Sequence, residues 1–534
     1  MKRKLLTALL CGALMLTSLA GCGQGAENQS GTSAGSESAV KDELVFVNYR
    51  DIRDLNPHLY AGEMYAQSIL YDTLVSNTSE GYVGCLAEDW TISEDGRTYT
   101  FNIRDGVTFS DGTPCDANAI LANFNAILEN RERHTWLEMM NLLVGVSAPD
   151  DDTFVIEMSE PYYPMLTELA CIRPFAMISP NCMIDGSTKD GVNGYIGTGP
   201  YVLTDFVTDE YAVFERNENY WGEKPAIRKI TVKVIPDNQT RIMALENGEI
   251  DLIFGKNMLD ADAISQYVDS DKFTVGLSDP TSTRHIVLNT THDILGDKSV
   301  RQALQHATNR QAISEGIFYG LEPAADTLYS TTVPYCDVDL EPYAYDVDEA
   351  ARLLDEAGWT MGSDGVRAKD GQKLALDLLY NSDSVTEKTI SEYLQSEYLK
   401  LGISLNIHGE EEQSYRDNMK AGNFDMVFNI CWGMPYDPQS SLAAMRAPVY
   451  GDYAAQQGLE DKAEIDQAIT DILTSTDETK RQELYTFVLT RLHEDAVYIP
   501  LTFETNKALY TSDLKGVHFG TDQYDVDFAS MYFE

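Results

Sequence analysis

The segment RERHTWLE, residues 131–138, gathers two arginines, a histidine and a tryptophan in a chain that is otherwise acidic. A guanidinium stays charged even when buried, and its parallel donors match the two oxygens of a carboxylate. Arg133 and Trp136 are three residues apart, so a helical backbone would place the charge and the indole on one face. The segment therefore predicts a site for a small anion with a flat apolar part.

Two local geometries fit this segment. Thr135 and Glu138 have the spacing of a capping box, which would begin a helix at Trp136 and aim its N-terminal amides at the anion. A helix that continues through the segment would instead keep Arg133 and Trp136 adjacent. The plainer alternative is that both arginines are solvated or paired with the glutamates beside them. We interpret Arg131 as a surface residue and Arg133 as a binding residue.

The charge of the whole chain excludes several classes of function. Its 534 residues include 85 Asp+Glu and 39 Lys+Arg, which gives a formal net charge of −46 at pH 7. Such a surface repels nucleic-acid phosphates and anionic lipid headgroups. With 43% hydrophobic and 23% charged residues the composition is that of a globular protein, and the length predicts at least two lobes.

The N-terminal region has the pattern of an export signal. Residues 1–21 combine a basic start with an apolar run that is too short for a good membrane span. The run ends in Leu-Ala-Gly-Cys22, which resembles the lipobox of bacterial lipoproteins, so Cys22 is the expected lipidation site. Residues 23–43 have the Gly/Ser/polar composition of a flexible tether, and folded structure is expected to begin near Leu44. A plain signal peptide that contains a cysteine is the alternative.

Strand-like and helix-like segments alternate along the rest of the chain. Residues 99–104 alternate as a strand, and Asp116 is placed to cap a helix whose apolar residues share one face. Residues 373–381, 384–400 and 403–409 have the patterns of a strand, a helix and a strand, which together make a βαβ unit. Such units in both parts of the chain predict an α/β protein with two lobes and a ligand between them.

Motifs for catalysis or for a dedicated metal site are missing from the sequence. It has no GxSxG elbow, HExxH helix, Walker loop or GxGxxG turn between a strand and a helix. The eight histidines are widely separated, and the cysteines form no CxxC pair. Disulfides are possible in an exported protein, but the sequence does not assign them. Binding is therefore favoured over catalysis, with an exported hydrolase as a minor alternative.

Several segments resemble the signature of solute-binding lipoproteins that feed peptide, oligopeptide and nickel ABC importers, which form extracellular solute-binding protein family 5. These segments are residues 90–120, 196–203, 216–237 and 247–252. The resemblance extends from about Leu44 to about residue 504. It is closest to the nickel-binding members, through residues 56–60, 131–138, 173–175, 409–416, 432–438 and 477–500.

The resemblance implies the two-lobed periplasmic-binding-protein fold, also called a Venus flytrap. Carried onto this sequence, lobe one holds residues 44–279 together with 499–534. An extra subdomain of lobe one is expected at about residues 86–197, and lobe two at residues 280–498. The ligand would lie in the cleft between the lobes.

In the nickel-binding relatives the metal arrives in a small chelator with carboxylates, which arginines and aromatic residues of the cleft hold. The resemblance therefore implies these ligand-binding residues: Tyr60, Met64, Arg133, Trp136, Arg173, Trp432, Tyr436 and, at a position that departs from the family, Tyr450. Arg133 and Arg173 would each bind one carboxylate. No residue of the chain is expected to coordinate the metal directly, and His58 is interpreted as structural.

The departure concerns the segment MRAPVY, where Tyr450 replaces a histidine that can ligate the metal in the best-known nickel-binding members. A neutral phenol is a poor ligand for nickel compared with imidazole. Either the chelator fills more of the metal's coordination sphere, or the ligand is not nickel.

The function that the resemblance implies is that of a monomeric substrate-binding lipoprotein, anchored by its lipid to the outer face of the cell membrane. It would bind a nickel chelate or another metallophore complex and deliver it to the permease and ATPase of an ABC importer, without a cofactor of its own. A dipeptide or oligopeptide binder is the main alternative, in which Asp437 would bind the amino terminus of the peptide. Haem is a third cargo that relatives accept.

Overall fold

The described part of the chain begins near the end of the predicted tether. The structure is a computed structural model that describes residues 41–60, 62–78, 81–255, 258–431, 438–520, 524 and 526–534. The predicted signal peptide and Cys22 lie outside the described residues. Strand β1 (Glu43–Asn48) begins the fold one residue before Leu44. Among the helices of these ranges, none combines the length and the hydropathy that a bilayer crossing needs.

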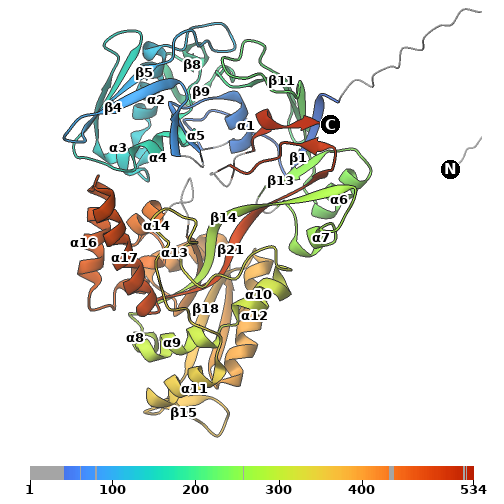
Figure 1. Ribbon diagram of the computed structural model, residues 1–534. Helices are drawn as coiled ribbons and strands as arrows, with labels where there is room; N and C mark the ends of the chain where they lie inside the picture. The colour runs from blue at the N-terminus through green and yellow to red at the C-terminus, as the bar shows by residue number, and fades with distance from the viewer. Residues whose placement is uncertain are drawn as a thin grey trace, which may run out of the picture. The chain divides into compact units, whose positions relative to one another are not determined.

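Within the described residues, a mixed sheet of ten strands runs through both halves of the fold (Figure 1). Strand β1 pairs in parallel with β12 and β13, and β18 pairs in parallel with β19 and β20, whereas the other pairs are antiparallel. In spatial order the strands are β10 (Tyr201–Val207), β11 (Tyr211–Arg216), β12 (Lys229–Val234), β1, β13 (Leu252–Phe254), β21 (Tyr498–Thr511), β14 (Phe273–Leu288), β20 (Met426–Cys431), β18 (Ala375–Asn381) and β19 (Ser404–Glu410).

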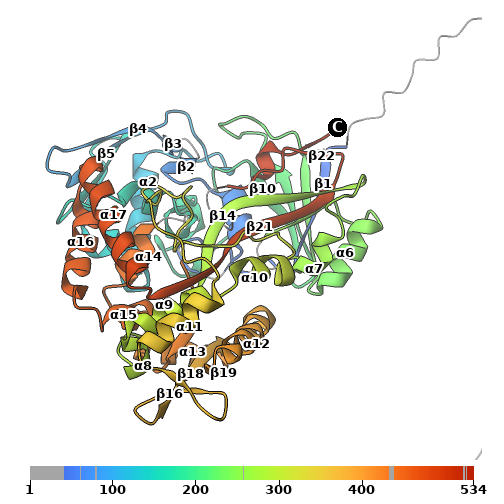
Figure 2. The same cartoon turned by 60° about the horizontal axis from the view of Figure 1, so that its bottom comes forward.

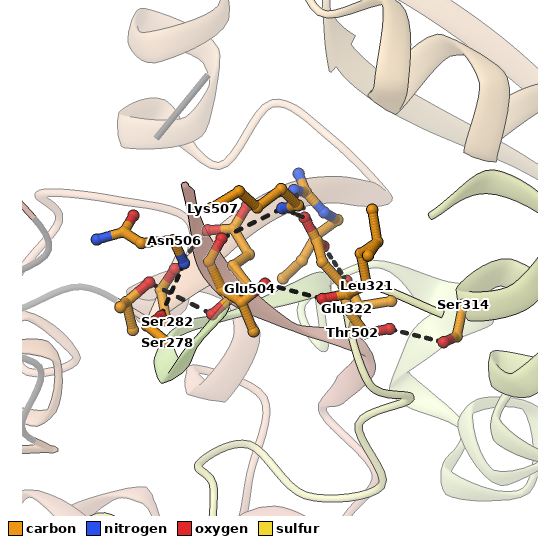
Figure 3. A network of polar contacts seen from close by, with 12 residues as sticks. Ser278, Ser282, Ser314, Leu321, Glu322, Thr502, Glu504, Asn506 and Lys507 are labelled. Atoms are coloured by element: carbon orange, nitrogen blue, oxygen red, sulfur yellow. Dashed lines mark hydrogen bonds and ion pairs between the residues drawn. The ribbon is translucent and has the colours of Figure 1, made fainter. Parts of the chain in front are cut away.

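Strands β14 and β21 are the longest of the sheet and connect its two halves. Figures 1 and 2 show them side by side, extending from the strands around β13 to those around β18. Their pairing shifts around Pro280, because proline has no N–H to donate to the ladder. A polar network lies along β21 at this crossing, with Glu504 and Lys507 on the strand and Glu322 beside it (Figure 3).

Two hydrophobic cores cover the two faces of the sheet in the first half. Successive side chains of a strand point to opposite faces. Accordingly, Phe46 of β1 packs in the core that contains helix α1 (Met64–Leu70), whereas Val47 packs in the core that contains α6 (Asn238–Glu246) and α7 (Ala261–Ser265). Helices on both faces make this part of the chain an α/β layer structure.

A small antiparallel sheet with its own core lies inside the first half of the sequence. Its strand order is β4 (Ala87–Ile92), β5 (Thr98–Ile103), β7 (Thr153–Met158) and β6 (Leu143–Ser147). Helix α2 (Ala117–Glu129) covers it, and the Asp116 side chain accepts a hydrogen bond from the Ala119 amide at 2.9 Å, so the predicted cap is confirmed. The remaining elements are β2 (Val75–Thr78), β3 (Gly81–Gly84), α3 (Glu138–Leu142), α4 (Met165–Leu169), α5 (Ile172–Phe175), β8 (Met183–Ile184) and β9 (Ser187–Val192).

The second half of the sheet is covered by helices that form two further cores. The predicted βαβ unit is confirmed: β18 and β19 pair in parallel, and the helix between them has Ser384 as its N-cap and Gly402 at φ +79° beyond its end. The helices are α8 (Asp293–Gly296), α9 (Lys298–Ala307), α10 (Arg310–Ile317), α11 (Val347–Glu356), α12 (Val385–Lys400), α13 (Glu412–Ala421), α14 (Pro438–Ala444), α15 (Asp452–Gln456), α16 (Lys462–Thr474) and α17 (Glu478–Glu494).

Separate cores lie in the first and second halves of the fold, and the division of the chain near residue 279 stays a prediction. Strand β14 contributes Phe273 to a core of the first half and Ile286 to a core of the second half. The six cysteines of the described residues are buried free thiols.

Candidate ligand-binding site

A cavity of about 900 Å³ is lined mainly by residues of the first half of the fold. It is lined by the end of β1, the loop that follows it, the start of α1 and the segment around β13. Trp136 and Arg173 reach it from the region of the small sheet, and Ile430 of β20 borders it from the second half. Of the residues predicted to bind ligand, Tyr60, Met64, Trp136 and Arg173 therefore share one cavity.

Tyr60 and Trp136 are joined by a hydrogen bond on the cavity wall. The indole Nε1 of Trp136 donates to the Tyr60 hydroxyl at 2.8 Å, and that hydroxyl lies 2.6 Å from Nδ1 of His134. Because the indole can only donate, the hydroxyl accepts from it and has its own proton free for Nδ1. Trp136 is held in this way with 45% of its surface exposed, which leaves an aromatic face for a ligand.

Burial sets the protonation states of this cluster. Burial, together with the nearby charge of Arg133, lowers the pKa of His134 to about 4, so the imidazole is neutral at pH 7. Burial also raises the pKa of Tyr60 to about 12, and the Trp136 hydrogen bond and the charges of Arg173 and Arg133 act against that rise. Both guanidiniums therefore lie close enough to influence one hydroxyl.

Arg173 is buried and anchored, yet it lines the cavity. Its Nε donates to Oε1 of Gln67 on α1 at 2.6 Å, and its Nη2 donates to the Gly62 carbonyl oxygen. Arg133 differs, because its side chain is exposed and no hydrogen bond or ion pair of its guanidinium exists within the described residues. The predicted pair thus consists of one fixed guanidinium in the cavity wall and one solvated guanidinium, that of Arg133, which is not among the described residues that line the cavity.

The local structure of residues 131–138 differs from both predicted geometries. A 3₁₀ helix, η1 (Arg131–His134), follows α2, and α3 begins at Glu138 rather than at Trp136. The amides of Glu138 and Met139 bind the carboxylate of Glu168 at 3.3 and 3.1 Å. The predicted capping box is therefore wrong, because an internal carboxylate occupies the amides that were assigned to a ligand. Burial raises the pKa of Glu168 to about 8.

Arg131 is not the surface residue that the sequence suggested. Its Nε donates to the Met140 carbonyl and its Nη2 to the Leu143 carbonyl, both at 2.6 Å, and the side chain is half-buried. These bonds satisfy carbonyl groups where α3 passes into β6. The physical reason for the wrong assignment is that the partners are main-chain oxygens, which sequence spacing does not reveal.

The remaining predicted residues lie in different surroundings. Trp432, Tyr436 and also Asp437 fall outside the described residues. Tyr450 is half-buried against the core of the second half, just before α15, and is not among the described residues that line the cavity. His58 is fully buried, with Nδ1 3.0 Å from the Thr188 hydroxyl and Nε2 3.3 Å from a carbonyl oxygen, in agreement with its structural interpretation.

Three charged residues of the cavity, Arg50, Glu63 and Arg241, were missed by the sequence reasoning. Arg50 and Glu63 form an ion pair, with Arg50 Nε 2.5 Å from Glu63 Oε1, and both line the cavity. The position of Arg50 in the sequence could have revealed it. Arg50 follows the carboxyl end of β1, and ligands of α/β sheets bind beyond the carboxyl ends of the strands. Arg241 also lines the cavity, but its guanidinium donates to three main-chain carbonyl groups.

No group of three or more His, Cys, Asp or Glu side chains that could hold a metal ion occurs within the described residues.

A cavity bordered by two α/β halves that long strands connect is typical of binding proteins that close on a small ligand. Residues 81–452 match the model of the bacterial extracellular solute-binding proteins, family 5 Middle, and the chain belongs to this family. The α/β, two-lobed fold class predicted from the sequence is thereby confirmed, with solved structures of the family as its neighbours.

Three similar proteins show which members of the family the chain resembles. The nickel-binding periplasmic protein of Escherichia coli (strain K12) is 41% identical over 499 residues, which is 92% of this chain and 95% of that protein. The crystal structure of NikA from Brucella suis in complex with Fe(III)-EDTA has a TM-score of 0.89 and 43% identity, and covers 92% of this chain and 100% of its own. The dipeptide-binding protein of Escherichia coli (strain K12) is 26% identical over 506 residues, 89% of this chain and 91% of that protein.

Proposed function

We propose that this chain is the substrate-binding lipoprotein of an ABC importer and that it binds a nickel chelate or a similar metallophore complex between its lobes. The observation that carries the proposal is the placement of Arg173 and Trp136 on one cavity wall. A buried, anchored guanidinium binds a carboxylate bidentately, and the exposed indole covers the apolar part of a chelator. The likeness to nickel-binding relatives supports this cargo.

Every predicted residue except Tyr450 has a part in this proposal. Arg173 binds one carboxylate from the wall of the cavity, and Arg133 binds a second one from the solvent side. Tyr60 fixes the indole, and Met64 adds apolar contact at the start of α1. Trp432 and Tyr436 are the residues through which lobe two would contact the same ligand. A ligand that touches both lobes favours the closed form, which then docks on the permease.

The proposal assigns the coordination of the metal to the chelator. Tyr450, which stands where relatives have a metal-ligating histidine, packs against the core of the second half. A neutral phenol is in any case a weak ligand for nickel. The cargo is accordingly a complex in which the chelator fills the coordination sphere, and the chain recognises its carboxylates.

The location and the division of the chain follow the same proposal. Lipid on Cys22 anchors the exported protein to the outer face of the membrane, and residues 23–43 tether the folded part. Lobe one holds residues 44–279 and 499–534 with its subdomain at about 86–197, and lobe two holds residues 280–498. The protein acts as a monomer without catalysis, and its partners are the permease and the ATPase that supplies the energy.

Native mass spectrometry of the protein purified from its own growth medium tests this function. The expected result is one bound small molecule per chain that contains nickel or another transition metal by elemental analysis. A metal-free bound peptide would contradict the proposal.

A dipeptide or oligopeptide cargo is the second candidate. It is favoured by the dipeptide-binding relative and by the buried carboxylate of Glu63 in the cavity, which is able to bind an amino terminus. Thermal unfolding with short peptides and with metal chelates separates the two candidates. A ligand that binds the folded protein tightly raises its Tm, whereas a molecule that does not bind leaves the Tm unchanged.

A further inference from the structure

Two arginines of the cavity are held by consecutive residues of the loop before α1. Arg173 Nη2 donates to the carbonyl oxygen of Gly62, and Arg50 Nε donates to Oε1 of Glu63 at 2.5 Å. Because neighbouring Cα atoms are about 3.8 Å apart, this short piece of backbone brings both guanidiniums to one region of the cavity wall. This part of the wall therefore presents two guanidiniums, and only that of Arg173 was expected.

The contacts of Arg50 fix its plane and leave one edge open. Its Nε is bound to Glu63, and its guanidinium carbon lies 4.8 Å from the centre of the Tyr49 ring. The side chain is 38% exposed, and in the part of the chain that the structure describes its only hydrogen bond is the one from Nε to Glu63, so no hydrogen bond uses the Nη atoms. The edge formed by Nη1 and Nη2 is the one that binds a carboxylate end-on with two parallel bonds. Arg241, by contrast, has its donors bound to main-chain oxygens.

Glu63 makes the Arg50 guanidinium selective for a ligand carboxylate that reaches its open edge. Its side chain is 10% exposed, and Asn48 Nδ2 donates to its second oxygen at 3.1 Å, so the carboxylate is held in one position. The charge of Arg50 is thus balanced without a ligand, and a distant anion is attracted only weakly to the pair. A ligand carboxylate at Arg50 therefore gains mainly the two hydrogen bonds at the open edge. These bonds form only when the other groups of the ligand already hold it in the cavity.

We propose that Arg50 is a third carboxylate-binding residue, so that the cargo is a metal complex whose chelator carries at least three carboxylates. This inference rests on the proposed function, in which Arg133 and Arg173 bind the other two. Sequence reasoning predicted a ligand with two carboxylates, and Arg50 extends that class to tricarboxylates and larger chelators.

Calorimetry with two nickel(II) complexes tests the inference on the full chain. Iminodiacetate and nitrilotriacetate present two and three carboxylates around the same amine donor. Arg50→Gln is expected to weaken binding of the nitrilotriacetate complex by about 10- to 100-fold, the loss of hydrogen bonds between charged groups. Binding of the iminodiacetate complex is expected to change by less than about threefold, since only long-range charge is removed.

Two further variants control this measurement. Arg53→Gln removes the same charge three residues away from an exposed side chain that does not line the cavity, and is expected to leave both affinities within about threefold. Arg50→Lys keeps the charge without the parallel donors and is expected to recover only part of the lost affinity.

The outcomes separate this inference from the proposed function. If the unaltered protein binds neither complex, the proposed function fails and the inference fails with it. If it binds both, but Arg50→Gln leaves them unchanged or weakens them equally, only the inference about Arg50 is overturned. A selective loss for the complex with three carboxylates supports it.

Discussion

The guanidinium of Arg481 lies over the ring of Tyr163, with Cζ 3.5 Å from the ring centroid. Tyr163 belongs to the predicted subdomain of lobe one, and Arg481 lies on α17, within the predicted lobe two. The Tyr163 hydroxyl also donates to Oε1 of Glu478 at 2.7 Å, and its amide donates to the Leu473 carbonyl at 3.2 Å. The two halves therefore touch at a second place besides the long strands, and α17 lies beside the subdomain in Figure 1.

We expect Tyr163→Ala to weaken closure of the two lobes. The substitution removes a contact between a cation and a desolvated ring, which is worth about 2 kcal/mol, and the hydrogen bond to Glu478. The radius of gyration in solution scattering should rise without ligand, and ligand affinity should fall. Tyr163→Phe is the matched control, because it keeps the ring over Arg481 and loses only the hydroxyl. An unchanged radius for Tyr163→Ala would show that this contact does not hold the lobes together.

The arginines predicted to bind carboxylates should differ in what their removal does. Arg133→Ala is expected to lower chelate affinity by roughly tenfold while leaving stability unchanged, because its guanidinium is solvated. Arg173→Ala should lower affinity further and also cost about 2 kcal/mol of stability, because Gln67 and Gly62 lose a buried donor. Calorimetry with a nickel chelate and urea unfolding measure the two effects. Equal losses of stability would contradict the distinction.

Residue spacing predicted the local structure correctly where the groups involved follow one another closely in the sequence. The Asp116 cap depends on an amide three residues away, and the elements of the βαβ unit at residues 373–409 follow one another directly in the sequence; both were predicted. The capping box at Thr135 failed, because Glu168, 30 residues further along the chain, binds the amide of Glu138 instead. Only the folded chain reveals such a partner.

The cavity residues that were predicted from the sequence are those that the resemblance to the family implies. The resemblance predicted Tyr60, Met64, Trp136 and Arg173, and the structure places these four on one cavity. Arg50 and Glu63 lie outside the segments that carried the resemblance, and the loop that brings the two side chains together cannot be derived from their spacing. Residues outside the segments that carry the resemblance can be found only from their surroundings in the folded chain.

His134 should make stability depend on pH in a predictable direction. Its pKa is lowered in the folded state to about 4, below the ordinary value of 6.5. Between these values the unfolded chain binds the extra proton, so the contribution of His134 is present above pH 6.5 and is lost as pH falls toward 4. Buried Glu168, with a pKa of about 8, acts in the opposite direction, because its protonated form is favoured in the folded state.

The difference between the unaltered protein and His134→Gln isolates that contribution. The free energy of unfolding of the unaltered protein should fall more steeply from pH 6.5 to pH 4.5 than that of the variant, by on the order of 1 kcal/mol or more. Chemical unfolding at several pH values measures both slopes. Parallel slopes would indicate that His134 titrates normally in the folded protein.

Removing one charge from the polar network at the crossing of β14 and β21 should lower the free energy of unfolding. Glu504 binds Arg284 and the Ser282 hydroxyl, while Glu322 accepts from Lys507 Nζ at 3.2 Å (Figure 3). Glu504→Gln leaves the buried Arg284 without its main counter-charge, so we expect a loss of about 3 kcal/mol or more in urea unfolding.

A double-mutant cycle distinguishes that ion pair from simple packing. Arg284→Met combined with Glu504→Leu replaces both charges by apolar groups of similar size, which often restores stability in buried pairs. We expect the double variant to be more stable than Glu504→Leu alone, with a coupling energy of about 1–3 kcal/mol between the two positions. Because both residues lie on the strands that connect the halves, the double variant should also alter ligand affinity through closure. Additive losses from the two single changes would mean that the pair contributes no specific interaction at this crossing.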